Sequence, residues 1–305
     1  MKIGVVGTGV MGKNHIRIYS DLRGVDEVCV YDVNETSTRL LDGFDLTICE
    51  SLEQLIENSE AISICVPTKQ HFAIARKIIH EEIPCLIEKP ITSSVEEAKL
   101  LVDSLQGRKL VVGVGHVERF NPIVAEVAKI IENPLFIETR RHNPSSSRIT
   151  DSSVVEDLMI HDIDIIFNVF IKLRSYSVFS AGTASVCKAV ITGKGPIVSL
   201  SASRAACKKI RSIYVEDESF TVEGDFMTQE VYTYHRPEKF SVQNEKYTQE
   251  SIIDKVLINK VEPLAVELKT FVTCVKRGVE FPVTPVQALA NLTICEQITR
   301  HLSEQ

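Results

Sequence analysis

The sequence lacks the cysteine spacing of a metal site or of a redox motif. Its eight cysteines include no pair separated by two residues and no other zinc-type spacing. Most of them lie inside apolar runs, such as Val28-Cys29-Val30 and Ile64-Cys65-Val66. We therefore expect buried free thiols, a cytoplasmic location and no bound metal.

The sequence also lacks a long apolar stretch and an excess of positive charge. No run approaches the ~20 apolar residues that a membrane-spanning helix needs, and the first residues predict a strand instead of a signal peptide. The formal net charge of −7 argues against general binding to nucleic acid or to an anionic membrane. These absences leave a globular protein that can still hold a local basic pocket around an anionic ligand.

Two patterns divide the 305 residues into two expected domains. Residues 1–120 alternate short β-rich runs with amphipathic segments, which is typical of a parallel sheet with crossover helices. Residues 121–305 contain successive strand-like runs between 175 and 235 without helices between them. We therefore expect an α/β chain with a Rossmann-type doubly wound parallel sheet, then an α+β domain with a large, mostly antiparallel open sheet.

The expected elements follow these patterns. The strands are Lys2–Val6, Glu27–Tyr31, Ala61–Val66, Cys85–Glu88, Lys109–Val114, Leu135–Arg141, Ser177–Ala184, Ile197–Ala202, Arg211–Val215, Ser219–Gly224 and Glu230–Tyr234. A long helix is expected over Val155–Lys172, and two helices, Pro263–Arg277 and Pro285–Leu302, finish the chain. The last helix is a candidate to pack back on the first domain.

Gly7-Thr8-Gly9-Val10-Met11-Gly12 is a GxGxxG motif that follows a predicted strand and opens a predicted helix. Gly7 permits the tight turn, Gly9 lets the backbone approach a pyrophosphate, and Gly12 lets the helix pack on the strand. The helix N-terminus then faces the phosphates with free N–H groups. Asp32 ends the second strand twenty residues after Gly12, where it can bind a ribose and repel a 2′-phosphate. The motif predicts NAD as the cofactor, in preference to NADP.

Two further segments follow predicted strands at the same edge of the sheet. Val66-Pro67-Thr68 closes one strand, and His71 follows as either a cofactor contact or a capping or core histidine. Glu88-Lys89-Pro90 ends an apolar run, and Pro90 biases Lys89 toward an extended conformation. Ligands bind at this edge in an open α/β sheet, although a solvated lysine in a turn is the alternative.

Residues 156–164 place a histidine among carboxylates on the long predicted helix. Asp157, His161 and Asp164 are spaced four and three residues apart, so they share one face of an α-helix. This arrangement suits a general base with orienting partners. The alternatives are a satisfied helix histidine with a surface charge pair, or a metal site, for which no further ligand cluster is evident.

These motifs, together with the sequence Gly115-His116-Val117-Glu118-Arg119-Phe120-Asn121-Pro122, resemble those of the glucose–fructose oxidoreductase/inositol dehydrogenase/rhizopine-catabolism (Gfo/Idh/MocA) family over nearly the whole chain. The resemblance implies hydride transfer between a sugar carbon and the nicotinamide of NAD. It implies that Lys89 lies near the nicotinamide and the sugar, that His161 acts as acid/base, and that Asp157 is the family's helix carboxylate. It also implies that the cofactor contacts Gly7–Gly12, Asp32, Val66, Pro67, Thr68, His71, Glu88 and Lys89.

The substrate is expected from finer details of the same motifs. Residues 114–122 and 156–164 resemble the branch of the family that acts on nucleotide-linked amino sugars, which implies the C3 hydroxyl of UDP-N-acetylglucosamine. In the basic stretch Arg140–Arg148, Arg141 and Arg148 suit bidentate phosphate contacts, although a solvated strand end and loop is the alternative. Arg119 and Asn121 are candidates to contact the sugar or the cofactor.

Two other functions stay open at this point. One is an NAD-dependent dehydrogenase of a free polyol or sugar such as myo-inositol. The other is a non-catalytic NAD-binding regulator, which would need neither Lys89 nor His161. The resemblance further implies a homodimer or homotetramer in which the antiparallel sheets of two subunits pair face to face.

Overall fold

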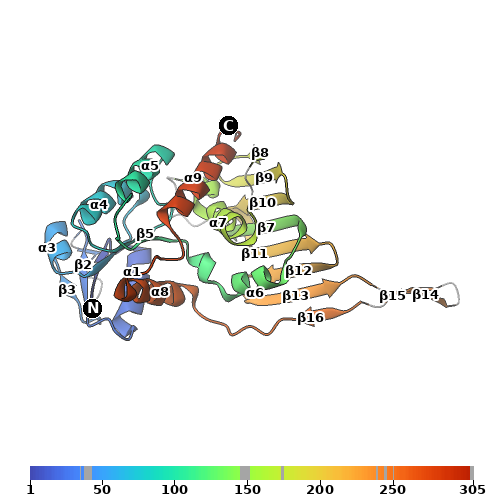
Figure 1. The fold of residues 1–305 in the computed structure, drawn as a ribbon, viewed down its shortest axis with the longest axis horizontal. Helices are drawn as coiled ribbons and strands as arrows, with labels where there is room; N and C mark the ends of the chain where they lie inside the picture. The colour runs from blue at the N-terminus through green and yellow to red at the C-terminus, as the bar shows by residue number, and fades with distance from the viewer. Residues whose placement is uncertain are drawn as a thin grey trace. The chain divides into compact units, whose positions relative to one another are not determined.

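The computed structural model describes residues 1–34, 36–37, 43–144, 152–172, 175–237, 240–243, 246–249 and 251–302. The chain forms two compact units (Figure 1). The first contains Met1–Phe120 and Glu262–Thr293, and the second contains Asn121–Val261 and Ile294–Gln305. The first unit therefore includes a segment from the C-terminal part of the chain.

The first unit is built on a parallel sheet of six strands in the order β3-β2-β1-β4-β5-β6. The strands are β1 (Lys2–Val6), β2 (Glu27–Tyr31), β3 (Thr47–Ile48), β4 (Ala61–Ile64), β5 (Cys85–Glu88) and β6 (Val112–Gly115). Helices α1 (Val10–Asp21), α3 (Leu52–Glu57), α4 (Thr68–His80) and α5 (Val95–Ser104) connect them. The strand order reverses between β1 and β4, which confirms the expected Rossmann-type sheet.

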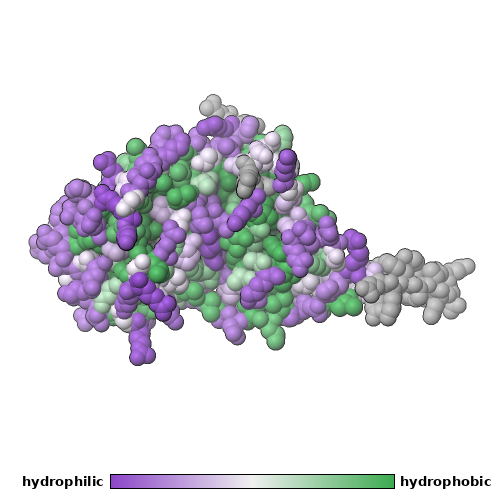
Figure 2. Space-filling model, in the orientation of Figure 1, coloured by the Kyte–Doolittle hydropathy of each residue, from purple (hydrophilic) through white to green (hydrophobic). Residues whose placement is uncertain are grey.

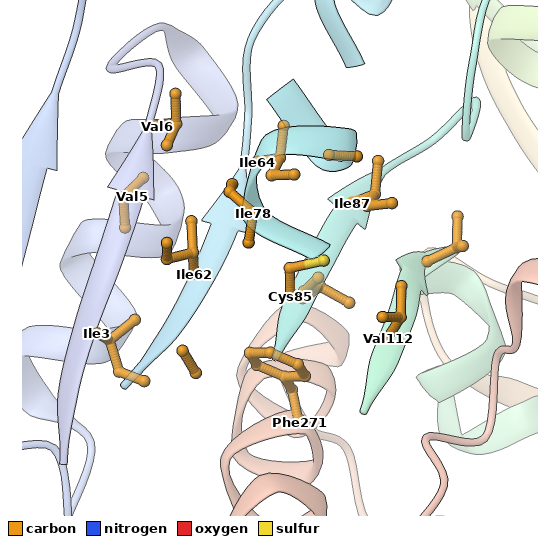
Figure 3. Close-up of a cluster of buried hydrophobic side chains, with 14 of the residues drawn as sticks. Ile3, Val5, Val6, Ile62, Ile64, Ile78, Cys85, Ile87, Val112 and Phe271 are labelled. Atoms are coloured by element: carbon orange, nitrogen blue, oxygen red, sulfur yellow. The ribbon is translucent and has the colours of Figure 1, made fainter. Parts of the chain in front are cut away.

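Apolar side chains on both faces of this sheet form the core of the first unit. The strands β4 and β5 are buried along their whole length, as is typical of parallel strands covered by helices. Figure 3 shows Ile78 of α4 and Phe271 of α8 (Pro263–Arg277) among the strand side chains. Phe271 is fully buried and packs edge-on against Phe281, with ring centroids 6.0 Å apart. Helix α8 is thus part of this core.

The second unit is built on an open sheet of eight strands in the order β16-β13-β12-β11-β7-β10-β9-β8. All neighbouring strands are antiparallel except β7 and β10, which confirms the expected mostly antiparallel sheet. The strands are β7 (Pro134–Pro144), β8 (Tyr176–Gly182), β9 (Val186–Gly193), β10 (Ile197–Ser203), β11 (Ala205–Asp217), β12 (Phe220–Asp225), β13 (Glu230–His235) and β16 (Ile253–Lys255). The short strands β14 (Phe240–Gln243) and β15 (Lys246–Gln249) pair separately.

Helices cover one face of the eight-stranded sheet (Figure 1). Helix α6 (Pro122–Ile130) packs on β12 and β13, and the helical segment Val155–Phe170 packs on β7 and β10. The opposite face is mixed: it carries the ion pair between Lys188 Nζ and Glu138 Oε1, 2.8 Å apart, and the exposed apolar side chains of Phe179, Val186 and Ile197. The last helix, α9 (Pro285–Thr299), contributes residues to both units.

One expectation about the second unit is wrong, and four of its strands were not expected. The expected continuous α-helix over Val155–Lys172 is instead a π-helical turn, η2 (Val155–Met159), a short α-helix, α7 (Ile160–Ile165), and a second π-helical turn, η3 (Ile166–Phe170). The unexpected strands are β9, β14, β15 and β16, although the burial of β9 alternates along the sequence. All eight cysteines lie among the described residues and are free, and six of them are buried as expected; Cys65 is only partly buried, and the expectation of burial is wrong for Cys207, which is exposed.

On the face drawn in Figure 2, hydrophilic side chains predominate over α3, α4 and α5. None of the helices among the described residues combines the length and the apolar character that crossing a membrane requires.

Phe271→Ala should lower the free energy of unfolding by about 3–5 kcal/mol, because it removes buried apolar area and leaves a cavity. Lys269→Ala, on the exposed side of the same helix, is the matched control and should change this free energy by less than about 0.5 kcal/mol. Urea unfolding measures both variants. Equal effects of the two substitutions would contradict the role of α8 in the core.

Candidate functional site

A glycine turn joins β1 to α1 where the strand order of the first sheet reverses. Gly7 has a φ of +88°, and a Cβ at this position would lie 2.8 Å from the Cys65 carbonyl oxygen. Gly12 approaches the turn so closely that a Cβ would lie 1.9 Å from the Gly7 oxygen. Gly9 caps α1 without a side chain and has open space where its Cβ would be. The first N–H groups of α1 therefore suit an anionic group such as a pyrophosphate.

Asp32 follows β2 beside this turn. Its Oδ2 accepts hydrogen bonds from the backbone N–H of Thr8 at 2.7 Å and from the Thr8 hydroxyl at 3.0 Å. Its Oδ1 accepts a third hydrogen bond, from the N–H of Asn34 at 2.8 Å. Val10 and Met11 begin α1 next to it, with Val10 exposed and Met11 half-buried. The predicted cofactor residues of the first two strands thus lie together, and their contacts with NAD stay predictions.

His71 lies in the first turn of α4, after the turn Val66-Pro67-Thr68. It is 1% exposed, with Nε2 2.9 Å from the Val66 carbonyl oxygen and Nδ1 2.8 Å from the Pro90 carbonyl oxygen. Burial lowers the pKa of His71 below its ordinary value of 6.5, and the two carbonyl oxygens offset this only in part. Because each ring nitrogen faces a backbone carbonyl oxygen, the predicted contact of His71 with the cofactor would have to use a carbon edge of the ring.

Glu88 is buried at the carboxyl end of β5, with Oε1 3.0 Å from Nε2 of His15 in α1. His15 donates this hydrogen bond, because an ionised carboxylate only accepts. Oε2 accepts from the backbone N–H of Lys89 at 3.2 Å. Burial alone would raise the pKa of Glu88, but the hydrogen bond and charge of His15 and the charge of Lys89 outweigh it and hold the pKa below its ordinary value.

Lys89 is half-buried and is joined to Pro90 by a cis peptide bond. It stands at the carboxyl edge of the sheet, with the ends of β1, β2 and β4 on one side in the strand order. This is the edge at which doubly wound sheets bind their ligands. The position fits the sequence prediction, and the catalytic role of Lys89 stays a prediction.

Arg119 and Asn121 make contacts within their own units. Arg119 donates a hydrogen bond to Gln287 Oε1 at 3.4 Å in the first unit. Asn121 is 3% exposed, and its Oδ1 caps α6 by accepting from the N–H of Ile123 at 3.3 Å, while its Nδ2 donates to the Phe226 carbonyl oxygen at 3.0 Å. Asn121 is thus a helix cap of the second unit. Contacts of the two residues with sugar or cofactor stay predictions.

Asp157 and His161 lie on the irregular helix of the second unit, and both are partly exposed. Asp157 Oδ2 lies 3.7 Å from Arg204 Nε, a charged neighbour that sequence reasoning did not consider. Asp164, in contrast, is fully buried and accepts a hydrogen bond from Asn168 Nδ2 at 3.1 Å. The π-helical turn over η2 also changes the angle between residues four apart. Asp157 remains a candidate partner of His161, whereas the carboxylate of Asp164 is buried inside the second unit and bonds to Asn168.

Arg141 forms a buried ion pair with Asp162, and the two side chains are only 1% and 2% exposed. Its Nε lies 3.0 and 3.1 Å from the two carboxylate oxygens, and one terminal nitrogen lies 2.6 Å from Oδ1. Removal of one partner of such a pair costs about 3–5 kcal/mol, so the pair is part of the fold. A phosphate contact by Arg141 stays a prediction, and it would require Asp162 to release the guanidinium. Arg148 lies outside the described residues.

The predicted residues form two sets, one in each unit. The first set lines the carboxyl ends of parallel strands and suits a dinucleotide. The second set, Asp157 and His161, offers a carboxylate and an imidazole for proton transfer. Among the described residues, no group of three or more histidine, cysteine, aspartate or glutamate side chains could hold a metal ion.

Comparisons with known proteins identify relatives over most of the chain. The model of an oxidoreductase family with an NAD-binding Rossmann fold (GFO_IDH_MocA) matches residues 1–116. UDP-N-acetylglucosamine 3-dehydrogenase of Acidithiobacillus ferrooxidans is 31% identical over 248 residues, which cover 77% of this chain and 77% of that protein. Inositol 2-dehydrogenase of Agrobacterium fabrum is 29% identical over 181 residues, which cover 54% of this chain and 53% of that protein.

Solved structures show the same fold. The structure of UDP-N-acetylglucosamine 3-dehydrogenase GnnA from Acidithiobacillus ferrooxidans matches with a TM-score of 0.90 and 26% identity, over 99% of this chain and 97% of that chain. Levoglucosan dehydrogenase in complex with NADH matches with a TM-score of 0.80 and 16% identity, over 99% of this chain and 96% of that chain.

His71→Gln should make the free energy of unfolding less dependent on pH in mild acid. The folded-state pKa of His71 lies below its ordinary value of 6.5, so the unfolded state binds more protons once the pH falls below that value. The free energy of unfolding of the wild type should therefore fall more steeply than that of the variant as the pH drops from about 6.5 to about 5. Urea unfolding across this range measures both slopes, and equal slopes would contradict a buried neutral His71.

Proposed function

Because the chain belongs to the Gfo/Idh/MocA family of NAD-binding oxidoreductases, we propose that this sugar dehydrogenase oxidises the C3 hydroxyl of UDP-N-acetylglucosamine. One observation carries the choice of substrate. A relative named for this activity aligns with 77% of the chain, whereas inositol 2-dehydrogenase of Agrobacterium fabrum aligns with 54%. The product would be the 3-keto nucleotide sugar.

Oxidation of a hydroxyl-bearing carbon requires removal of a hydride and of the hydroxyl proton. NAD, when bound, would supply the acceptor of the hydride. His161 takes the proton, because an imidazole can accept a proton near neutral pH and this ring is partly exposed. Asp157 orients His161, and Arg204, whose Nε lies 3.7 Å from Asp157 Oδ2, holds the Asp157 carboxylate in place.

Lys89 assists by donating a hydrogen bond to the same substrate oxygen. Negative charge develops on this oxygen as the proton leaves, and a fixed ammonium group stabilises it. The Gly7–Gly12 turn and the N-terminus of α1 hold the pyrophosphate of NAD, and Asp32 binds the adenosine ribose. Three observations support these assignments: the open N-terminus of α1, the position of Lys89 at the strand ends, and the partial exposure of His161.

We further propose that the enzyme works in the cytoplasm as a homodimer or homotetramer. The free thiols fit the reducing cytoplasm. The face of the eight-stranded sheet opposite its helices exposes Phe179, Val186 and Ile197, and these apolar side chains fit the pairing of two copies in a homodimer or homotetramer. Arg148 is the arginine that we propose for the phosphates of the nucleotide sugar, since Asp162 already engages Arg141.

Incubation of the protein with NAD and UDP-N-acetylglucosamine should produce NADH and a sugar nucleotide that is lighter by two hydrogens. Absorbance follows NADH, and mass spectrometry follows the product. myo-Inositol, tested in parallel, should give no NADH, because it offers no phosphates to bind. NADH from myo-inositol alone would favour the polyol dehydrogenase. Absence of NADH with every sugar tested, with NAD still bound, would favour a regulator.

His161→Gln should lower kcat by about 100- to 10,000-fold, because the variant removes the general base. The dissociation constant of NADH should stay unchanged, since the glycine turn and Asp32 belong to the other unit. His235→Gln, an exposed histidine of the same unit that pairs with Asp254, is the matched control and should keep the wild-type kcat. Steady-state kinetics and NADH fluorescence titration measure these constants. A kcat near the wild-type value in H161Q would rule out His161 as the base.

A further inference from the structure

We infer that two buried histidines, His15 and His71, are positioning residues that hold the backbone of Lys89 from both sides. His15 holds Glu88, the residue before Lys89, and His71 holds Pro90, the residue after it. The two histidines come from different helices, α1 and α4. The effect of this arrangement on catalysis rests on the proposed function of Lys89. The contacts of the two histidines are independent of that function.

The first side of the arrangement runs from α1 to the N–H of Lys89. His15 is fully buried, and its Nε2 lies 3.0 Å from Glu88 Oε1. Its Nδ1 makes no hydrogen bond within the part of the chain that the structure describes, so the bond to Glu88 is what the ring provides. The other oxygen of Glu88 accepts the N–H of Lys89 at 3.2 Å. A buried carboxylate without such a donor is costly, which fixes the pair as a unit.

The second side runs from α4 to the carbonyl group of Pro90. His71 is 1% exposed and spans the Pro90 oxygen, 2.8 Å from Nδ1, and the Val66 oxygen, 2.9 Å from Nε2. A neutral ring carries one N–H and donates to one of these carbonyls in each tautomer. In either case the ring fills the space between the end of β4 and the residue after Lys89.

Strand β6 contributes as well, because its Gly115 leaves space for the carboxylate of Glu88. A Cβ on Gly115 of β6 would lie 3.1 Å from the carboxyl carbon of Glu88, so a larger residue would displace the carboxylate. Lys89 is therefore fixed at its N–H, and the next residue, Pro90, lies against the His71 ring, which donates to the Pro90 carbonyl in the Nδ1–H tautomer. A displacement of about 1 Å at a catalytic group can cost about 100-fold in rate, so such fixing has a direct effect on turnover.

His15→Leu and His15→Gln test the inference in the full-length protein. Leucine keeps the volume of the ring but removes the donor to Glu88, and glutamine keeps a donor at nearly the same reach. His15→Leu should lower kcat about 10- to 100-fold with little change in the KM for NAD, and His15→Gln should restore most of it. A role in stability alone would lower the melting temperature of His15→Leu and leave the kcat of the folded enzyme unchanged.

A second readout does not need a substrate. Reductive methylation with ¹³C labels the lysines and keeps their charge, and Lys89→Arg identifies the NMR resonance of Lys89. This resonance should shift in His15→Leu and return in His15→Gln. Glu88→Gln, which removes the carboxylate but keeps the shape of the side chain, should shift the same resonance. This variant replaces His15→Leu in the test if His15→Leu does not fold.

The outcomes separate the inference from the proposed function. An unchanged Lys89 resonance with a wild-type kcat in His15→Leu would overturn the inference and leave the dehydrogenase in place. A shifted Lys89 resonance in His15→Leu, combined with a wild-type protein that forms no NADH with any sugar, would uphold the positioning of Lys89 and overturn the function.

Discussion

The close approach of α1 to β1 is the constraint on which the first unit depends. It exists because Gly12 has no Cβ, which would otherwise lie 1.9 Å from the Gly7 oxygen. The same approach leaves the N-terminus of α1 open to an anion and brings His15, one turn further along the helix, to Glu88 at the far side of β4. The absence of a side chain at Gly12 thus affects both the candidate phosphate site and the position of Lys89.

Elements whose apolar residues have clear boundaries in the sequence could be predicted. The strands β1, β2 and β5 and the helix α8 have the predicted bounds, because each apolar run ends sharply at polar residues or at glycine or proline. Strand β9 was missed because small and polar residues dilute its alternation of Cys187, Ala189 and Ile191. The π-helical turns could not be predicted, since packing on the sheet and not the local sequence determines such turns.

The candidate site was predictable in its motifs but not in its long-range contacts. The pair of His15 and Glu88 spans 73 residues of sequence, so no local pattern could reveal it. The burial of Arg141 did have a signal: it lies an even number of residues from the buried Ile137 and Thr139, so its side chain points to the same face of β7. Arg140, of opposite parity, is the arginine that faces water.

The single parallel pairing of the second sheet has a consequence for how the protein opens. Between β7 and β10 the chain forms the helical segment with Asp157 and His161 and then the strands β8 and β9. Both ends of this long excursion are fastened at the centre of the sheet, where β10 lies beside β7. Local unfolding in proteins begins at termini and edges. We therefore expect the amide hydrogens of β7 and β10 to exchange later than those of the two edge strands, β16 and β8.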